Sequence, residues 1–212
     1  VTKSRKLGEG NFGEAWKGSL AHKGGGKTEV AIKIPKDNVN ENDASKEARA
    51  LMNIGQHENI VGFLGLVNMG GKPCFLLEFC SGGDVESIIR KRPKSFTKDA
   101  SFESLSGGLA HLHNRDIVHR DIAARNILLR GDGTAVLSDY GLARLTKKGK
   151  SGDDYYRAAI LNTAWRWTAP ESLSEQKFTK ASDIYMLGVT MWEVFNGKKP
   201  HSDVTNIWKA IS

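Results

Sequence analysis

Hydrophobic and polar residues alternate with a period of two along much of the first third of the chain. The alternation predicts strands over Glu29–Ile34, Val61–Val67 and Cys74–Phe79, separated by turns that contain glycine. Residues 40–54 instead place apolar side chains at helical spacing and open with Asn and Asp candidates for a helix cap. The apolar positions of this helix are Ala44, Ala48, Leu51 and Met52. The first part of the chain is therefore predicted to be a sheet that carries one helix.

The pattern becomes mainly helical after Gly82 and Gly83, which we interpret as a hinge. The predicted helices cover Val85–Lys91, Lys98–His113 and Ser182–Phe195. A polar stretch from Thr146 to Asp154 is predicted to be a mobile loop. The chain is thus expected to have an α+β, bilobal fold, with a small β-rich lobe over residues 1–80 and a larger, mainly helical lobe over residues 81–212. The cleft between the lobes is the default site.

Composition is that of a folded protein without a membrane span. The 212 residues are 39% hydrophobic and 26% charged, and the longest apolar stretches are too short to cross a bilayer. Cys74 and Cys80 have neither metal-ligand nor disulfide-framework spacing, which suits a reducing compartment. We therefore expect a soluble, cytoplasmic chain.

The net charge of +7 raises the question of nucleic-acid binding. The basic residues are scattered, and only Lys147, Lys148 and Lys150 cluster, without aromatic residues between them. A solvated face or a phosphate-handling site is the better interpretation, so no nucleic-acid partner is predicted.

Two segments of the first lobe have the residues of a phosphate site. "GEGNFGEAWKG" has glycines at positions 8, 10 and 13, and a hairpin with such a tip can place backbone N–H groups over phosphates; an ordinary surface turn is the alternative. "VAIK" ends in Lys33, which is costly within an apolar strand unless it is paired or reaches solvent. Glu47 is the natural partner on the predicted helix, with Glu41 as the other candidate.

These two segments are followed, in a fixed order, by four more motifs. They are "HRDIAARN" (119–126), "SDYGLA" (138–143), "APE" (169–171) and "SDIYMLGV" (182–189). In this order the motifs resemble those of the eukaryotic protein kinases, across most of the chain. The resemblance implies the bilobal kinase fold, with ATP and Mg²⁺ as cofactors.

The same resemblance implies the roles of the polar residues. Asp121 would orient and deprotonate the substrate hydroxyl, while Asn126 and Asp139 would bind magnesium. Lys33 would hold the α- and β-phosphates and would be fixed by Glu47. The nucleotide would contact Leu7, Gly8, Gly10, Gly13, Ala15, Ala31, Lys33, Glu78, Cys80 and Leu128.

The loop also indicates which hydroxyl accepts the phosphate. Serine/threonine kinases usually have a lysine two residues after the catalytic aspartate, and Ala123 stands there. Arg125 and Trp167 are similar to the pattern of the tyrosine kinase branch, receptor-type enzymes included. A protein substrate with tyrosine is therefore expected, with serine/threonine or dual specificity as an alternative.

Three residues are regulatory candidates by the resemblance. Arg120 would pair with a phosphate on Tyr155 or Tyr156, and such phosphotyrosines would give signalling partners a site to read. His119 is expected to be a packed structural residue.

Some positions depart from the family pattern. Ala15 replaces a usual valine, Tyr140 a phenylalanine and Ala164 a proline. A kinase domain usually continues for several helices beyond Pro200, so we expect a catalytic domain that is incomplete at its C-terminal end, with Glu171 buried and lacking its arginine. The alternatives are a nucleotide-binding but inactive interaction module, or the cytoplasmic part of a membrane receptor.

Overall fold

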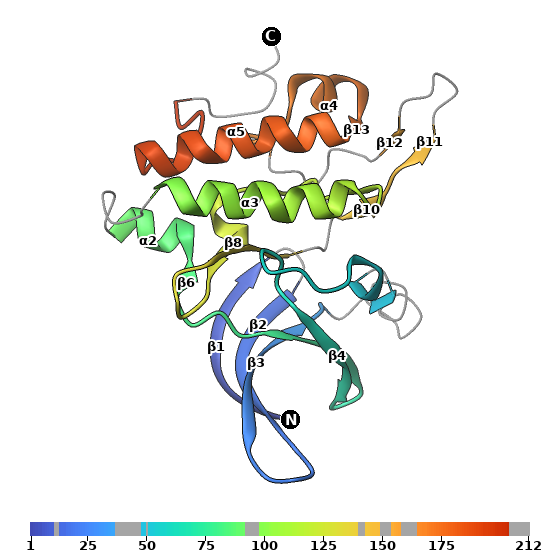
Figure 1. The fold of residues 1–212 in the computed structure, drawn as a ribbon, viewed down its shortest axis with the longest axis vertical. Helices are drawn as coiled ribbons and strands as arrows, with labels where there is room; N and C mark the ends of the chain where they lie inside the picture. The colour runs from blue at the N-terminus through green and yellow to red at the C-terminus, as the bar shows by residue number, and fades with distance from the viewer. Residues whose placement is uncertain are drawn as a thin grey trace. The chain divides into compact units, whose positions relative to one another are not determined.

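The computed structural model describes residues 1–10, 13–36, 48–49, 51–91, 98–139, 143–148, 154–157 and 165–203. The chain divides into two compact units, Val1–Ser81 and Gly82–Ser212. The first unit is rich in strands and the second in helices, so the predicted α+β fold is confirmed (Figure 1). In the described ranges, no helix is long and apolar enough to cross a membrane.

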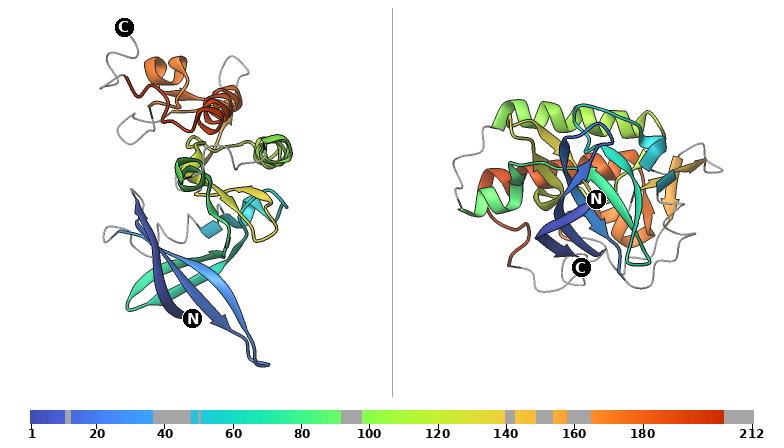
Figure 2. Two further views of the ribbon diagram at one scale, coloured as in Figure 1. Left: turned by 90° about the vertical axis from the view of Figure 1, so that its left-hand side faces the viewer. Right: turned by 90° about the horizontal axis from the view of Figure 1, so that it is seen from below.

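The first unit contains an antiparallel five-stranded sheet in the order β1-β2-β3-β5-β4. Its strands are β1 (Thr2–Gly10), β2 (Gly13–Ala21), β3 (Lys27–Ile34), β4 (Phe63–Met69) and β5 (Lys72–Glu78), and their twist is visible in Figure 2. Each of the three strands predicted from alternation is present, with its ends shifted by at most two residues. These shifts are small because the alternation marks the strand centre better than its ends.

The two faces of this sheet differ in chemistry. Val30, Ile32, Cys74 and Leu76 form a buried cluster on one face. Burial raises the pKa of the Cys74 thiol, so this cysteine is protonated and acts as a small apolar residue. Because side chains alternate along a strand, the residues between them on β3, Ala31 and Lys33, lie on the other face.

The helix predicted over residues 40–54 is helical at 48–49 and 51–54, and its earlier residues, including Ala44, lie outside the described ranges. Ala48 and Leu51 are buried, as predicted. Met52 is 61% exposed, so its assignment to the apolar face is wrong. Each residue turns a helix by about 100°, and this places Met52 beyond the edge of the buried face set by Ala48 and Leu51.

The second unit is built around three helices, α2 (Val85–Lys91), α3 (Lys98–His113) and α5 (Lys180–Asn196). The first two helices have the predicted bounds. The third begins two residues earlier than predicted because Thr179 caps it, its side chain accepting a hydrogen bond from the backbone N–H of Ser182.

Short elements complete this unit. They are β6 (Gly83–Asp84), β7 (Ile117–Val118), the 3₁₀ turn η1 (Ala124–Asn126), β8 (Ile127–Leu129), β9 (Ala135–Leu137), β10 (Arg144–Leu145), β11 (Lys147–Lys148), β12 (Asp154–Arg157), α4 (Pro170–Glu175) and β13 (Lys177–Phe178). Gly83 is part of β6, which pairs with β8, so the backbone pairing of the two strands holds this residue in place. The predicted loop over Thr146–Asp154 is wrong at Lys147–Lys148 and at Asp154, because backbone pairing between β11 and β12, which side-chain polarity does not reveal, forms strands there. Residues 149–153 of this loop lie outside the described ranges.

Helices α3 and α5 lie side by side with nearly parallel axes; Figure 2 shows both end-on. Their contact includes the stacked rings of Phe102 and Phe195, whose centroids are 5.7 Å apart. The core of this unit contains Val85, Ile89, Leu105, Leu109, Leu112, Val118, Ile122, Leu137, Phe178, Met186 and Val194. Ile122 belongs to the loop at 119–126, so this loop is anchored in the core.

Candidate active site

The segment "HRDIAARN" connects β7 to β8 through η1, and its polar residues converge on Asp121. The Oδ1 atom of Asp121 forms an ion pair with Arg125, and its Oδ2 atom accepts a hydrogen bond of 2.8 Å from the Nδ2 atom of Asn126. Asp121 is buried while Arg125 is partly exposed. The carboxylate is thus held in one orientation by a cation and an amide from its own loop.

Asn126 and Asp139 are the two predicted magnesium ligands. The Nδ2 atom of Asn126 also donates to the backbone O of Asp121 at 2.7 Å, so the amide nitrogen is engaged and Oδ1 is the atom left to bind a ligand. The backbone O of Asn126 accepts bonds of 2.9 Å from both N and Oγ of Ser138, the residue before Asp139. These bonds hold the two predicted ligands in neighbouring segments.

The donor chemistry at this point fits Mg²⁺. Amide and carboxylate oxygens are hard ligands, and magnesium in kinases takes one or two protein oxygens together with phosphate and water. Within the described ranges no group of three or more His, Cys, Asp or Glu side chains could form a separate metal site. The side-chain oxygens of Asn126 and Asp139 could serve as such protein ligands, with nucleotide oxygens supplying others.

His119 is a structural residue, as predicted. It is fully buried, and its Nδ1 atom accepts a hydrogen bond from the backbone N–H of Asp121 at 3.3 Å. The proton of a neutral ring is then on Nε2, which donates to the backbone O of Ser138 at 3.1 Å. Because both nitrogens serve the backbone, His119 is not placed to act as a base.

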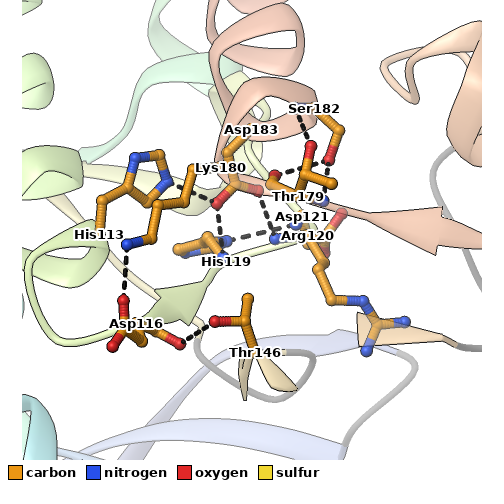
Figure 3. A network of polar contacts seen from close by, with 10 residues as sticks. All are labelled: His113, Asp116, His119, Arg120, Asp121, Thr146, Thr179, Lys180, Ser182 and Asp183. Atoms are coloured by element: carbon orange, nitrogen blue, oxygen red, sulfur yellow. Dashed lines mark hydrogen bonds and ion pairs between the residues drawn. The ribbon is translucent and has the colours of Figure 1, made fainter. Parts of the chain in front are cut away.

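Helix α5 fixes the same loop through three polar side chains on one face. Asp183 accepts bonds from the backbone N–H groups of His119 (2.8 Å) and Arg120 (2.9 Å), as Figure 3 shows. Thr190 donates to the backbone O of Ile122 at 3.1 Å. The third side chain, Glu193, accepts from the backbone N–H of Ala124 at 3.0 Å. Asp183, Thr190 and Glu193 thus brace the backbone of the loop at three points.

Sequence reasoning missed Glu193. Its Oε2 atom also accepts a bond of 2.8 Å from the indole Nε1 of Trp167, and the Trp167 ring lies 4.7 Å from the guanidinium carbon of Arg125. Burial raises the pKa of Glu193, although its two hydrogen bonds act in the opposite direction. The one available signal was an acidic residue inside the apolar stretch Met191–Phe195.

The regulatory candidates lie around the small sheet of β11, β12 and β13. Arg120 is buried with φ of 70°, and its guanidinium lies 4.7 Å from the ring of Tyr156 and 4.5 Å from that of Phe178. Tyr155, the preceding residue on β12, has Arg157 at 5.5 Å and Lys177 at 4.9 Å from its ring. Both candidate tyrosines therefore have cationic neighbours.

In the first unit, Lys33 is partly exposed on β3, between Ala15 of β2 and Phe75 of β5. Ala31 lies two residues away on the same face, opposite Leu77. Lys33, Ala15 and Ala31 thus share the face away from the apolar cluster. The same face also carries Phe75 and Leu77 of β5, which lie opposite Lys33 and Ala31.

The glycine-rich segment is the hairpin of β1 and β2, as predicted, with its tip at residues 11–12 outside the described ranges. Gly8 pairs with Ala15, and Gly10 pairs with Gly13. Gly13 has φ of 130°, and a Cβ atom there would lie 2.0 Å from the backbone O of Ile34, so only glycine fits. Leu7, on the same hairpin, is exposed.

The remaining predicted positions are distributed over both units. Glu78 donates its backbone N–H to the backbone O of Gly62 at 2.8 Å, and Cys80 is buried. Leu128 is partly exposed on β8 of the second unit. Glu171 is exposed in the first turn of α4, so its expected burial is wrong. Glu47, Tyr140 and Ala164 lie outside the described ranges.

Comparison with known proteins agrees with this geometry. A family model described as protein tyrosine and serine/threonine kinase matches residues 1–210, and the chain belongs to that family. It is 36% identical to ephrin type-B receptor 3 of Xenopus laevis and 35% identical to ephrin type-B receptor 2 of Gallus gallus, each over 94% of the chain. The chain spans about a fifth of the length of these relatives, 21% and 20% respectively. The family implies use of ATP and a divalent metal.

Proposed function

We propose that this chain is the catalytic domain of an ATP- and magnesium-dependent protein-tyrosine kinase. The observation that carries the proposal is the Asp121 carboxylate, held between Arg125 and Asn126, with the Trp167 ring beside Arg125. Family membership and the similarity to receptors support it. Residues 1–80 and 81–212 would form one catalytic domain, with the nucleotide between them.

Different residues of the chain would bind the phosphates, accept the proton and stabilise charge during phosphoryl transfer. Asp121 would orient the substrate hydroxyl and accept its proton. Lys33, fixed by Glu47, would hold the α- and β-phosphates, and Arg125 would place positive charge near the transferred group. Bound Mg²⁺, on Asn126 and Asp139, would supply neutralisation of the phosphate charge. No covalent intermediate on the protein is required.

The nucleotide would contact the β1–β2 hairpin through its phosphates and a second set of residues through its base. The hairpin with Leu7, Gly8, Gly10, Gly13 and Ala15 would cover the nucleotide, with backbone N–H groups toward its phosphates. The base would lie between Ala31 and Leu128, with backbone hydrogen bonds at Glu78 and Cys80. These assignments rest on position in the family pattern, supported by the shared face of Ala15, Ala31 and Lys33.

Tyrosine specificity follows from the loop. Ala123 is small and buried where a serine/threonine kinase usually has lysine, and Arg125 is the cation beside Asp121 instead. The test is phosphoamino-acid analysis after incubation with ATP, Mg²⁺ and either poly(Glu,Tyr) or a serine- and threonine-rich protein. We expect phosphotyrosine. Phosphoserine alone would contradict the specificity, and nucleotide-dependent thermal stabilisation without transfer would favour an inactive interaction module.

Substitution of both regulatory candidates is expected to lower activity. A phosphate on Tyr155 or Tyr156 would meet nearby cations, among them Arg120, Arg157 and Lys177. We expect the double change Tyr155→Phe with Tyr156→Phe to reduce turnover about tenfold, the value of one charge-assisted hydrogen bond. Tyr185→Phe, on the exposed face of α5, is the matched control. Unchanged turnover in the double variant would contradict the regulatory role.

We also propose a cellular location and the partners of this chain. The names of the relatives describe receptors, so this chain would act in the cytoplasm, as a separate protein or as the cytoplasmic part of a membrane receptor. Its partners would be tyrosine-containing protein substrates and proteins that read phosphotyrosine, without nucleic acid.

A further inference from the structure

Glu193 is a buried carboxylate to which phosphoryl transfer, as outlined above, assigns no role. It is 2% exposed on α5, and a buried charge is costly unless hydrogen bonds compensate it. Two donors do so, both on Oε2: the backbone N–H of Ala124 at 3.0 Å and the indole Nε1 of Trp167 at 2.8 Å. An apolar residue would fill this position of α5 at less cost, so the acid calls for a reason beyond packing.

The two donors come from segments 43 residues apart in the chain, which also meet where the Trp167 ring lies beside Arg125. Ala124 lies in η1, between Asp121 and Arg125. Trp167 lies just before α4, in the segment that would receive the substrate backbone. Its ring is 4.7 Å from the Arg125 guanidinium carbon, and Arg125 pairs with the Asp121 carboxylate. A closed circuit of contacts thus runs from Glu193 through Trp167, Arg125 and Asp121 back to Glu193 by way of Ala124.

We propose that Glu193 is a positioning residue that couples the substrate-side segment at Trp167 to the Asp121–Arg125 pair. This inference rests on the proposed kinase function and adds a residue to it. Glu193 holds the indole so that the ring lies beside the guanidinium, and the same oxygen holds the loop that carries Asp121. A substrate that moves Trp167 therefore also moves Arg125, and the orientation of the carboxylate responds to occupancy of the substrate-side segment.

Glu193 differs in its contacts from the two other polar residues of α5 that bond to the loop. Asp183 and Thr190 also bond to the loop, but within the described residues their hydrogen bonds reach only the loop, His113 and α5 itself. Glu193 alone among these three side chains bonds to Trp167 as well. Its removal should therefore affect the catalytic step beyond any effect on stability.

The test is a double-mutant cycle in kcat. Trp167→Phe keeps a ring beside Arg125 but removes the indole N–H, and Glu193→Ala removes the acceptor. Each is expected to lower kcat about tenfold, with KM for ATP within about twofold of wild type. Combined, they should lower kcat no further than Glu193→Ala alone, because that change already breaks the contact that Trp167→Phe breaks. Glu193→Gln, which keeps an acceptor oxygen, should recover part of kcat.

Rates are expressed per nucleotide-binding site, so that misfolded protein is not counted. Asp116→Asn, which changes an exposed ion pair with Lys180, is the control and should match wild type. Independent, multiplying effects of the two changes, or kcat per site equal to the control, would overturn the inference.

A second readout separates this inference from the proposed function. The indole N–H resonance of Trp167, assigned with Trp167→Phe, should shift in Glu193→Gln and stay in place in Asp116→Asn. If wild type transferred no phosphate, the kinase proposal would fail while this resonance would still test the contact. A resonance unmoved by Glu193→Gln would overturn the inference in either case.

Discussion

Replacement of Asp121 by Asn is expected to lower phosphoryl transfer by about 10²- to 10⁴-fold, the range attributed to a general base. Asn keeps the volume of Asp but accepts no proton at neutral pH. It also removes the negative charge that pairs with Arg125. The measurement is initial-rate transfer to poly(Glu,Tyr) with saturating ATP and Mg²⁺.

Nucleotide binding should persist in this variant. By the proposed roles, the groups that hold ATP are Lys33, Asn126 and Asp139, and none of them is changed. Stabilisation by nucleotide in thermal unfolding should therefore stay within about 1 °C of wild type, by mass action at equal affinity. Transfer at more than about a tenth of the wild-type rate would show that Asp121 is not the base.

Local patterns predicted the second unit well where one periodicity dominated. The bounds of α2 and α3 follow from apolar spacing between clear breaks, and both are confirmed. Met52 was misplaced because apolar spacing alone gives the direction of a face but not its edges. Lys147–Lys148 form a strand because their backbone pairs with β12. The side chains at these two positions do not predict that pairing.

The candidate site was predictable where motifs name single residues. Asp121, Asn126 and Asp183 stand in fixed motifs, and the structure joins Asp121 to Asn126 and Asp183 to His119 by hydrogen bonds, while the catalytic and magnesium-binding roles stay predictions. Glu193 was missed because its donors, Ala124 and Trp167, are 69 and 26 residues away and only the tertiary fold joins them. Convergence of Lys33 with the Asp121 group stays a prediction, since it depends on how two separately folded units pack, which local sequence does not encode.

Replacement of Asp183 by Ala is expected to cost the largest amount of stability of any change considered. Asp183 is fully buried and accepts three bonds, from the backbone N–H groups of His119 and Arg120 and from Nε2 of His113 at 3.0 Å. Each buried donor left without an acceptor costs about 1–3 kcal/mol, so a total of about 3–5 kcal/mol is expected. For a chain of this length that corresponds to a melting temperature lower by about 10 °C.

Asp183→Ala should also reduce activity in the protein that remains folded. Arg120 has φ of 70°, a conformation that costs about 1–3 kcal/mol for a non-glycine residue and here is held by the bond from its N–H to Asp183. Without that acceptor the backbone before Asp121 can relax, and the carboxylate loses its fixed orientation.

A matched control lies in the same polar network. Asp116→Asn changes an exposed aspartate whose Oδ1 atom pairs with Lys180 at 2.6 Å, and its backbone O continues to accept from Thr146 (Figure 3). Exposed ion pairs contribute little, so this control should shift the melting temperature by no more than about 2 °C. Differential scanning fluorimetry of the three proteins makes the comparison. The large difference expected between the two variants comes from the buried donors that Asp183→Ala leaves without an acceptor. Equal melting temperatures for Asp183→Ala and Asp116→Asn would therefore show that α5 does not hold the loop through Asp183.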